Sequence, residues 1–190
     1  MNRKVLVFTV IGLAALGLFV FSCAEKEEVS KESKPEAAEG KTLSYISDEI
    51  SFGLFFDSEG TKRTIKLSRG QKEFVGYLYV QFPESMEIAA VQWRLELPEG
   101  VKITNDKYCD SRIMSLGQIP IGLSERFKPC LAGPKALIHT LTFTTAADLK
   151  NATFSILPTE DSGVLGVAVC TEAYPIERAS SYKAVVNPEN

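Results

Sequence analysis

The sequence predicts an all-β fold, an antiparallel β-sandwich of about eight or nine strands, either immunoglobulin-like or jelly-roll in arrangement. Two observations support this prediction. Apolar residues recur at every second position in several runs, which is the period of a half-buried strand and not of a helix. The runs are separated at near-regular spacing by short segments rich in Gly, Pro, Ser and Asp, which are typical of turns.

The clearest strand is residues 88–98, where apolar side chains occupy alternate positions at Ala89, Val91, Trp93, Leu95 and Leu97. Alternation of this kind places one face of a strand against the core. The predicted strands are, in order, residues 50–56, 63–67, 73–82, 88–98, 135–145, 152–158, 164–170 and 181–186. In residues 135–145, the inward face is predicted to carry Leu137, His139, Leu141 and Phe143. Only residues 145–149 allow a helical turn.

The first 22 residues read as an export signal. Arg3 and Lys4 precede an uncharged apolar run of 17 residues, Val5 to Phe21, which ends just before Cys23. A positive segment followed by an apolar one is the layout of a secretory signal, although this length also reaches the lower limit of a membrane span. An uncleaved anchor helix, or ordinary cleavage after Ala24, therefore stays open from length alone.

The residues at the end of this run, Val20-Phe21-Ser22-Cys23, resemble the lipobox of bacterial lipoproteins. The resemblance implies that residues 1–22 are removed and that Cys23 carries fatty acyl chains such as palmitate, which would hold the protein to a membrane. Lipoproteins with Asp after this cysteine commonly stay at the inner membrane. Because Ala24 follows Cys23 here, the resemblance implies a lipid-anchored protein of the cell envelope, at the outer membrane if the host has one.

Residues 23–41 and 42–190 differ sharply in composition. The first segment is rich in Glu and Lys and has one branched aliphatic residue, Val29, so we expect a disordered charged tether. Residues 42–190 are long enough to bury a self-sufficient core and are predicted to form a single β-sandwich domain. The net charge of the chain is −3, and no basic cluster occurs in the domain. This argues against nucleic acid as a partner.

Residues 69–103, RGQKEFVGYLYVQFPESMEIAAVQWRLELPEGVKI, are similar to the opening of cohesin-type and related carbohydrate-binding sandwich domains. Residues 136–145 resemble a later strand of that fold more loosely. The resemblance implies a jelly-roll or immunoglobulin-like sandwich. Cohesins bind dockerins, but the resemblance assigns no dockerin-contacting residue in this chain and nothing catalytic.

Three cysteines, Cys109, Cys130 and Cys170, remain in the domain if Cys23 is lipidated. In an oxidising compartment we expect one disulfide and one cysteine left over. The entropy of loop closure does not choose between the pairings, since the stabilisation expected from the two disulfide loops differs by less than the error of the chain-entropy relation. Cys130 and Cys170 both lie at predicted strand ends, which favours Cys130–Cys170 over Cys109–Cys130. No spacing fits a zinc site, so no metal or other cofactor is predicted.

The sequence offers no catalytic constellation. His139 is the only histidine and is expected on an inward apolar face, which is typical of a satisfied core residue. Without a second histidine, no Ser–His–Asp or Cys–His arrangement is available elsewhere. The acid pairs Asp57/Glu59 and Glu160/Asp161 lie in turns, where such residues are usual. We therefore do not expect an enzyme.

Two functional hypotheses follow from the sequence. The first is a membrane-tethered binding or adhesion module for a glycan or a protein, with Tyr77 and Tyr79 as candidate ligand-stacking residues if their strand face is open. The alternative is a structural accessory lipoprotein, a subunit buried in a larger envelope assembly. The sequence does not identify the ligand or the partner.

Overall fold

A computed structural model describes residues 46–189 of the chain. The predicted signal peptide, residues 1–22, and the predicted tether, residues 23–41, lie outside the described residues. Among residues 46–189, no helix is long and apolar enough to cross a membrane.

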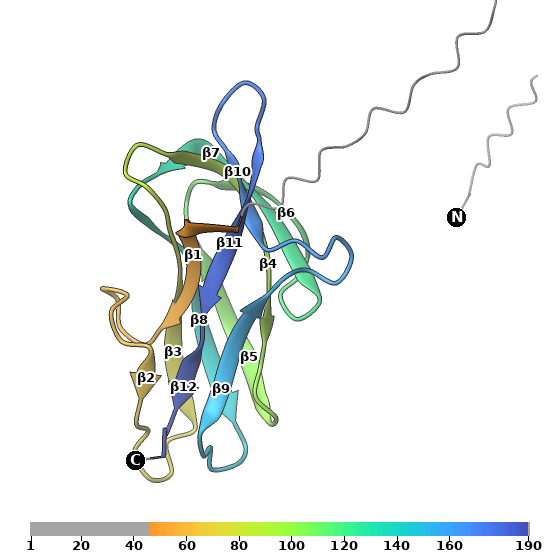
Figure 1. Cartoon of the computed structure of the whole chain (residues 1–190). Helices are drawn as coiled ribbons and strands as arrows, with labels where there is room; N and C mark the ends of the chain where they lie inside the picture. The colour runs from red at the N-terminus through yellow and green to blue at the C-terminus, as the bar shows by residue number, and fades with distance from the viewer. Residues whose placement is uncertain (1–45, 190) are drawn as a thin grey trace, which may run out of the picture. The chain divides into compact units, whose positions relative to one another are not determined.

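The described residues form twelve β-strands (Figure 1). In chain order they are β1 (Ile46–Phe55), β2 (Thr64–Ile65), β3 (Glu73–Gln81), β4 (Glu87–Glu96), β5 (Val101–Tyr108), β6 (Arg112–Gln118), β7 (Gly122–Ala132), β8 (Lys135–Thr145), β9 (Ala152–Leu157), β10 (Gly166–Val169), β11 (Ile176–Tyr182) and β12 (Ala184–Val186). The predicted all-β class is confirmed. All pairings are antiparallel except β1 with β11 and β2 with β12, which are parallel.

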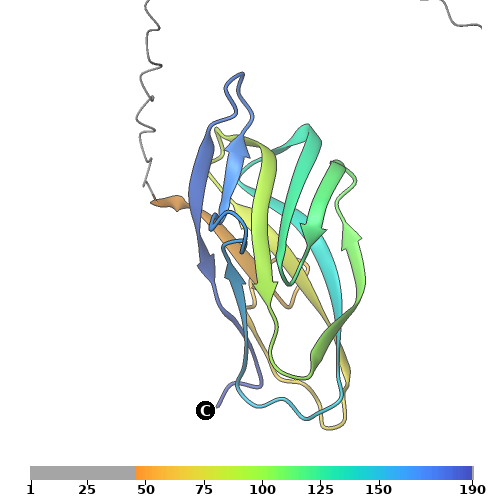
Figure 2. The same cartoon turned by 90° about the vertical axis from the view of Figure 1, so that its right-hand side faces the viewer.

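The strands fold over into two layers, and their pairing branches at β4, which pairs with β7, β9 and β10 (Figure 2). The path β6–β7–β4–β10–β11–β1–β3–β8–β5 leaves β5 and β6 as its two ends within residues 46–189. β9 pairs with the second half of β4 and with β12. The sandwich is therefore joined on the side of β10, β11 and β1, and ends in unpaired edges on the side of β5 and β6.

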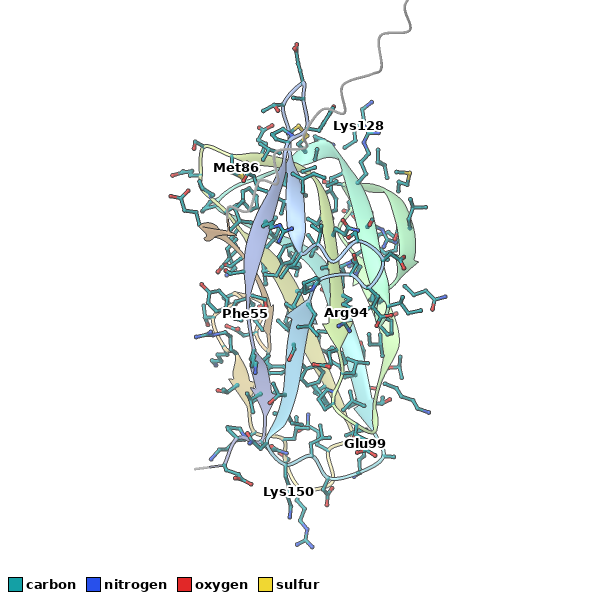
Figure 3. The ribbon with its side chains drawn as sticks, turned by 45° about the vertical axis from the view of Figure 1, so that its right-hand side comes forward. Phe55, Met86, Arg94, Glu99, Lys128 and Lys150 are labelled. Atoms are coloured by element: carbon teal, nitrogen blue, oxygen red, sulfur yellow. A yellow bond between two sulfur atoms is a disulfide. The ribbon has the colours of Figure 1, made fainter. Side chains whose placement is uncertain are left out.

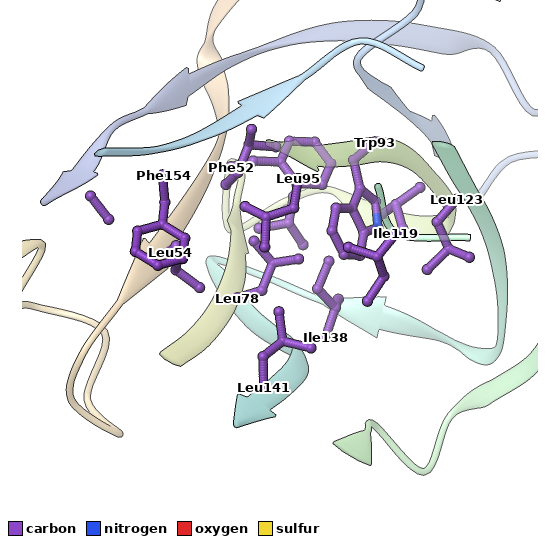
Figure 4. Close-up of a cluster of buried hydrophobic side chains, with 14 of the residues drawn as sticks. Phe52, Leu54, Leu78, Trp93, Leu95, Ile119, Leu123, Ile138, Leu141 and Phe154 are labelled. Carbon is purple, nitrogen blue, oxygen red and sulfur yellow. The ribbon is translucent and has the colours of Figure 1, made fainter. Parts of the chain in front are cut away.

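The core lies between the layers and uses the alternation seen in the sequence. Trp93 and Leu95 of β4 point toward Leu78 of β3 and toward Ile138 and Leu141 of β8 (Figure 4). All five side chains are at most 1% exposed. Burying a large apolar side chain contributes roughly 1.5–3 kcal/mol, so this interlayer contact is a main source of stability.

Three strands lie in residues 101–132, where the alternating pattern predicted none. β5 and β6 are edge strands, and nearly all side chains of β6 are exposed, so neither shows a clean apolar alternation. β7 does alternate, with Leu123, Glu125 and Phe127 facing inward. A charged residue at the middle inward position conceals that pattern in the sequence.

Two local predictions were wrong. In β8, a register shift opposite Leu78 and Tyr79 inserts Ile138 as an extra residue, so Ile138 and His139 are both buried and Leu137 leaves the inward face. Residues 146 and 147 form bends and residues 148 and 149 are irregular, without a helix; the Thr145 hydroxyl bonds the backbone of Ala147 instead.

A disulfide joins Cys130 of β7 to Cys170, the residue after β10, which confirms the favoured pairing. Cys109 is the free cysteine of the described residues and is partly buried. The disulfide therefore links β7 to the end of β10, and both of these strands pair with β4.

Figure 3 shows the two ends of the sandwich. The side chain of Lys128, on β7, projects at one end, and Glu99 and Lys150 lie at the other.

Candidate functional site

A buried ionic cluster lies between the two layers, and His139 is its centre. The His139 side chain is fully buried on β8. Its Nδ1 lies 2.6 Å from Oδ1 of Asp106 on β5, and its Nε2 lies 2.8 Å from Oε2 of Glu125 on β7. Each ring nitrogen therefore faces a carboxylate oxygen at hydrogen-bond distance.

The Glu125 carboxylate is only 1% exposed and has three partners. Trp93 Nε1 on β4 donates to Oε2 over 3.2 Å, and Arg112 Nη1 on β6 donates to Oε1 over 2.9 Å. With His139, these contacts bring together β4, β6, β7 and β8. A buried carboxylate is tolerated when it is paired and hydrogen-bonded in this way.

Local backbone irregularities aim these side chains at one another. The extra residue Ile138 in β8 precedes His139, and a second register shift in β5, between Ile103 and Asn105, precedes Asp106. A bulge changes which face the following side chains occupy. The cluster therefore depends on backbone features that a pattern of apolar residues does not reveal.

The cluster favours the charged imidazolium. Burial by itself lowers the pKa of His139, but the hydrogen bonds to Asp106 and Glu125, together with their negative charges, outweigh burial and raise the pKa above its ordinary value of 6.5. With two carboxylates, Arg112 and a protonated His139, the formal charges of the cluster balance. Both nitrogens of His139 are occupied, so the ring has no free position for general acid–base work in this arrangement.

The remaining groups at the cluster fit a structural role. The Arg112 guanidinium lies over the Tyr108 ring, 3.1 Å from its centroid. Burial, and then the negative charge of Glu125, raises the pKa of the Cys109 thiol above 9.0. A thiol with a raised pKa is a poor nucleophile because the reactive form is the thiolate.

The outer surface of the β6–β7–β4–β10 layer carries an exposed apolar patch. We call it the apolar face and define it by six residues: Ala90, Met114, Leu116, Val164, Ala168 and Ile176. Met114 is 48% exposed, and Leu116 and Ile176 are each 62% exposed. They surround a pocket of about 210 Å³ whose lining also includes Glu125 and Arg126. Exposed apolar side chains that are grouped in this way commonly mark an interaction site.

A second hollow, of about 620 Å³, lies between the edge strands β5 and β6. Its apolar lining includes Val101, Ile103 and Leu123, and its polar lining includes Asp106 and Arg112 of the ionic cluster. Asp106 and Arg112 of the cluster therefore line the groove, whereas the Glu125 side chain faces the interior.

The two tyrosines suggested for ligand stacking differ in accessibility. Tyr77 is partly buried, whereas Tyr79 is 8% exposed and lies under the turn that follows β1. The Tyr79 hydroxyl donates to the carbonyl of Ser58, Lys135 Nζ lies 4.5 Å from the ring centroid, and the ring of Phe55 meets it edge-on at 5.9 Å. The open face that sugar stacking requires is therefore not present at Tyr79.

The acids that the sequence placed in turns have ordinary turn roles. Desolvation opposes ionisation of Asp57, but bonds from the Thr61 hydroxyl and from the amides of Lys62 and Thr61 lower the pKa of Asp57 to about 2. Glu160 lies 3.7 Å from the Arg94 guanidinium at the surface. Neither pair brings two carboxylates together in a cleft.

One group of donor atoms among the described residues has the proximity of a metal site. A carboxylate oxygen of Glu87 and the sulfurs of Cys130 and Cys170 all lie within 4.8 Å of one another. The sulfurs are joined in the disulfide, whereas a metal requires thiolates. The arrangement present therefore does not supply a ligand set. Cys23, the predicted lipidation site, lies outside the described residues.

The alternating pattern did not reveal the candidate site residues between 101 and 132. Asp106, Arg112 and Glu125 appeared as unremarkable charges, and Met114 and Leu116 as isolated apolar residues. One signal was available: Glu125 lies between Leu123 and Phe127 at period two, which indicates an inward-facing carboxylate that needs a buried cation.

No family model matches this sequence, and no curated protein is similar to it in sequence. Solved structures do resemble its fold. A cohesin module from a Clostridium perfringens family 33 glycoside hydrolase superposes with a TM-score of 0.53 at 9% identity, covering 75% of this chain and 100% of that one. The cohesin in a Clostridium thermocellum cohesin–dockerin complex gives 0.51 at 10% identity, covering 74% and 99%.

A non-cellulosomal cohesin from the archaeon Archaeoglobus fulgidus gives a TM-score of 0.50 at 5% identity, covering 75% of this chain and 92% of that one. At such low identity the likeness speaks for the arrangement of strands and not for shared chemistry. The chain therefore has the fold of a cohesin-like β-sandwich.

Proposed function

We propose that this protein is a lipid-anchored protein-binding module of the cell envelope, and that the apolar face holds its protein partner. The observation that carries the proposal is the exposure of Met114, Leu116 and Ile176 around one apolar pocket. Burying such side chains against a partner is favourable by roughly 25 cal/mol for each Å² of apolar surface removed from water.

The composition of the face favours a protein over a sugar as ligand. Long, flexible apolar side chains such as Met adapt to apolar protein surfaces, and Arg126 at the pocket adds a cation that can pair with an acid of the partner. Sugar sites usually present an open aromatic ring, and none lines this pocket. A glycan ligand therefore has less support than a protein ligand.

The similar structures add support of a second kind. The Clostridium thermocellum structure is a complex of a cohesin with a dockerin, which is a protein ligand. A sandwich of this fold can therefore present a protein-binding surface. The anchor and the envelope location rest on the sequence of residues 1–23, and the partner class on the apolar face.

The proposal is tested with the full chain purified in detergent and used to capture proteins from envelope extracts of its source cells. We expect a partner that Leu116→Lys loses at least tenfold, because the substitution places a charge in the apolar contact. Ile121→Lys is the matched control: Ile121 is 50% exposed but does not line the pocket. Equal capture by both variants, or none by the unmodified chain, would contradict the proposal.

The accessory-subunit alternative predicts a different result in the same extract. A permanent subunit runs with its partners at native size in detergent, whereas a free binding module runs alone until partner is added. Native-size analysis of the anchored chain therefore separates the two functions.

A further inference from the structure

We propose that the ionisation of His139 controls the apolar face, so that the face keeps its binding geometry while the imidazole is charged and changes when the proton is lost. The inference rests on the proposed function only for the role of the face. The coupling itself concerns the folded chain alone and is testable without a partner.

The number of protons on the His139 ring decides how many carboxylates it can bond. An imidazolium donates from both nitrogens and so satisfies Asp106 and Glu125 together, at 2.6 and 2.8 Å. A neutral imidazole has one N–H and one lone pair. It can donate to only one carboxylate, and its lone pair would then face the other carboxylate at contact distance. With Asp106 and Glu125 both ionised, the observed arrangement therefore fits the charged ring and not the neutral one.

The two carboxylates differ in exposure, and this decides which of them loses its hydrogen bond to a neutral imidazole. The Glu125 side chain is 1% exposed and the Asp106 side chain is 30% exposed. An unpaired carboxylate has a much lower free energy in water than in the protein interior. On deprotonation, the remaining N–H therefore stays with Glu125, and Asp106 turns toward the groove between β5 and β6, where it already contributes to the lining.

Asp106 is also linked to the apolar face. Two residues after Asp106, the ring of Tyr108 stacks beneath the Arg112 guanidinium at 3.1 Å. Arg112 is the first residue of β6 and also bonds to Glu125. The turn between β5 and β6 is short, so the start of β6 cannot move independently of the end of β5. Met114 and Leu116 follow on β6, which pairs with β7 alone among the described strands. Movement at Asp106 is therefore passed to an edge strand with few other restraints.

Asp106 of β5 and Glu125 of β7 bond to His139 directly. The charged or titratable groups around this pair are Arg112 of β6 and the Cys109 thiol, which act on Glu125, and Tyr108 of β5, which lies under Arg112. β4 adds the Trp93 N–H, and β3 packs against His139 with Leu78. Because the fold raises the pKa of His139, its stabilisation is fully present below the ordinary value of 6.5. It is lost as the pH rises through the raised value, so the face changes on the alkaline side.

The test uses methyl NMR on the full chain in detergent, with carbon-13 on the methionine methyl groups. The chain contains only Met1, Met86 and Met114, and only one histidine, so each signal has a single origin. We expect the Met114 methyl to shift with the same midpoint as the His139 ring proton, while Met86 of the β3–β4 turn stays constant. A Met114 signal that does not follow His139 overturns the proposal.

The variant Asp106→Asn gives the decisive comparison. An Asn amide can either accept from the charged ring or donate to the neutral one, so both states fit. We expect the His139 midpoint to fall by about one pH unit or more and the Met114 step to disappear. Asp110 is an exposed acid in the turn that follows β5, so Asp110→Asn should leave both the midpoint and the Met114 step unchanged. A Met114 step of unaltered size in Asp106→Asn refutes the mechanism.

The two proposals fail in different experiments. A Met114 step that follows His139, with no partner lost on Leu116→Lys, upholds the coupling and refutes the binding role of the face. A partner lost on Leu116→Lys, with Met114 constant across the His139 titration, upholds binding and refutes the coupling.

Discussion

Glu125 is the residue on which the interior depends most, because it is a buried carboxylate that neutralises two cations. Arg112 and His139 both bond to it. Removing one member of a buried ionic group leaves its partners uncompensated, which costs about 3 kcal/mol or more. We therefore expect Glu125→Gln to lower the free energy of unfolding by about 3 kcal/mol. Urea denaturation followed by the fluorescence of Trp93, the only tryptophan, measures it.

Glu160→Gln provides the control for this prediction. Glu160 is also paired with an arginine, but at 3.7 Å and with its side chain 60% exposed. Exposed ion pairs contribute about 0–1 kcal/mol. The two substitutions remove the same charge from the same residue type, so similar losses would show that burial of the cluster does not determine its contribution.

At the scale of the residue, the sequence predicts which side chains are buried better than it predicts which side chains bond to one another. The burial of Trp93 and His139 followed from alternation. The reason that a buried histidine is tolerated did not, because Asp106 and Glu125 lie 33 and 14 residues away in sequence. Pairing across strands is set by register, and a single bulge changes which side chains meet.

The β6–β7 hairpin carries Met114 and Leu116 of the apolar face, and Gly117 sets the geometry of this hairpin. Gly117 has φ of +93°, and a Cβ there would lie 2.1 Å from the carbonyl oxygen of Gly122 on β7. Gly117→Ala therefore adds a backbone clash to the cost of a left-handed conformation. We expect it to destabilise the protein by more than about 2 kcal/mol and to increase hydrogen exchange in β6.

Gly100→Ala separates the two contributions. Gly100 also has a positive φ, +75°, but a Cβ there would meet nothing within 4 Å. It should cost only about 1 kcal/mol and leave exchange in β6 unchanged. Equal costs at the two positions would mean that the hairpin relaxes around the clash.

At the scale of the element, predictability follows burial. Strands with one clean apolar face, such as β4 and β9, were found from period two because half of each lies in the core. β5 and β6 were missed because edge strands bury little, so their side chains carry no alternating constraint. Met114 and Leu116 of the apolar face lie on β6, which is why the sequence did not reveal these two residues.

At the scale of the whole molecule, the sandwich class and the Cys130–Cys170 bridge were predictable, since both depend on patterns spread along the chain. The parallel pairing of β11 with β1 was not predictable, because it joins residues more than 100 positions apart. The same scale raises the question of location, because a binding face is useful only where its partner is present.

The lipid anchor is the remaining prediction, and it concerns the mature protein. If the resemblance at residues 20–23 reflects processing, the native chain begins at Cys23 and carries acyl mass there. Mass spectrometry of the N-terminal peptide should find this, and the protein should enter the detergent phase on phase separation. Cys23→Ser should remove the acyl mass and, where cleavage then fails, keep Met1.

Cys109→Ser is the matched control, because it removes the free thiol of the domain and leaves the lipidation site intact. It should retain both the acyl mass and the detergent partition. Two acyl groups or more are needed for stable anchoring, since a single chain of about 14 carbons binds membranes only marginally. A native chain that retains Met1, or one that begins at an unmodified Cys23, would leave the domain without this anchor and would limit the proposal to protein binding alone.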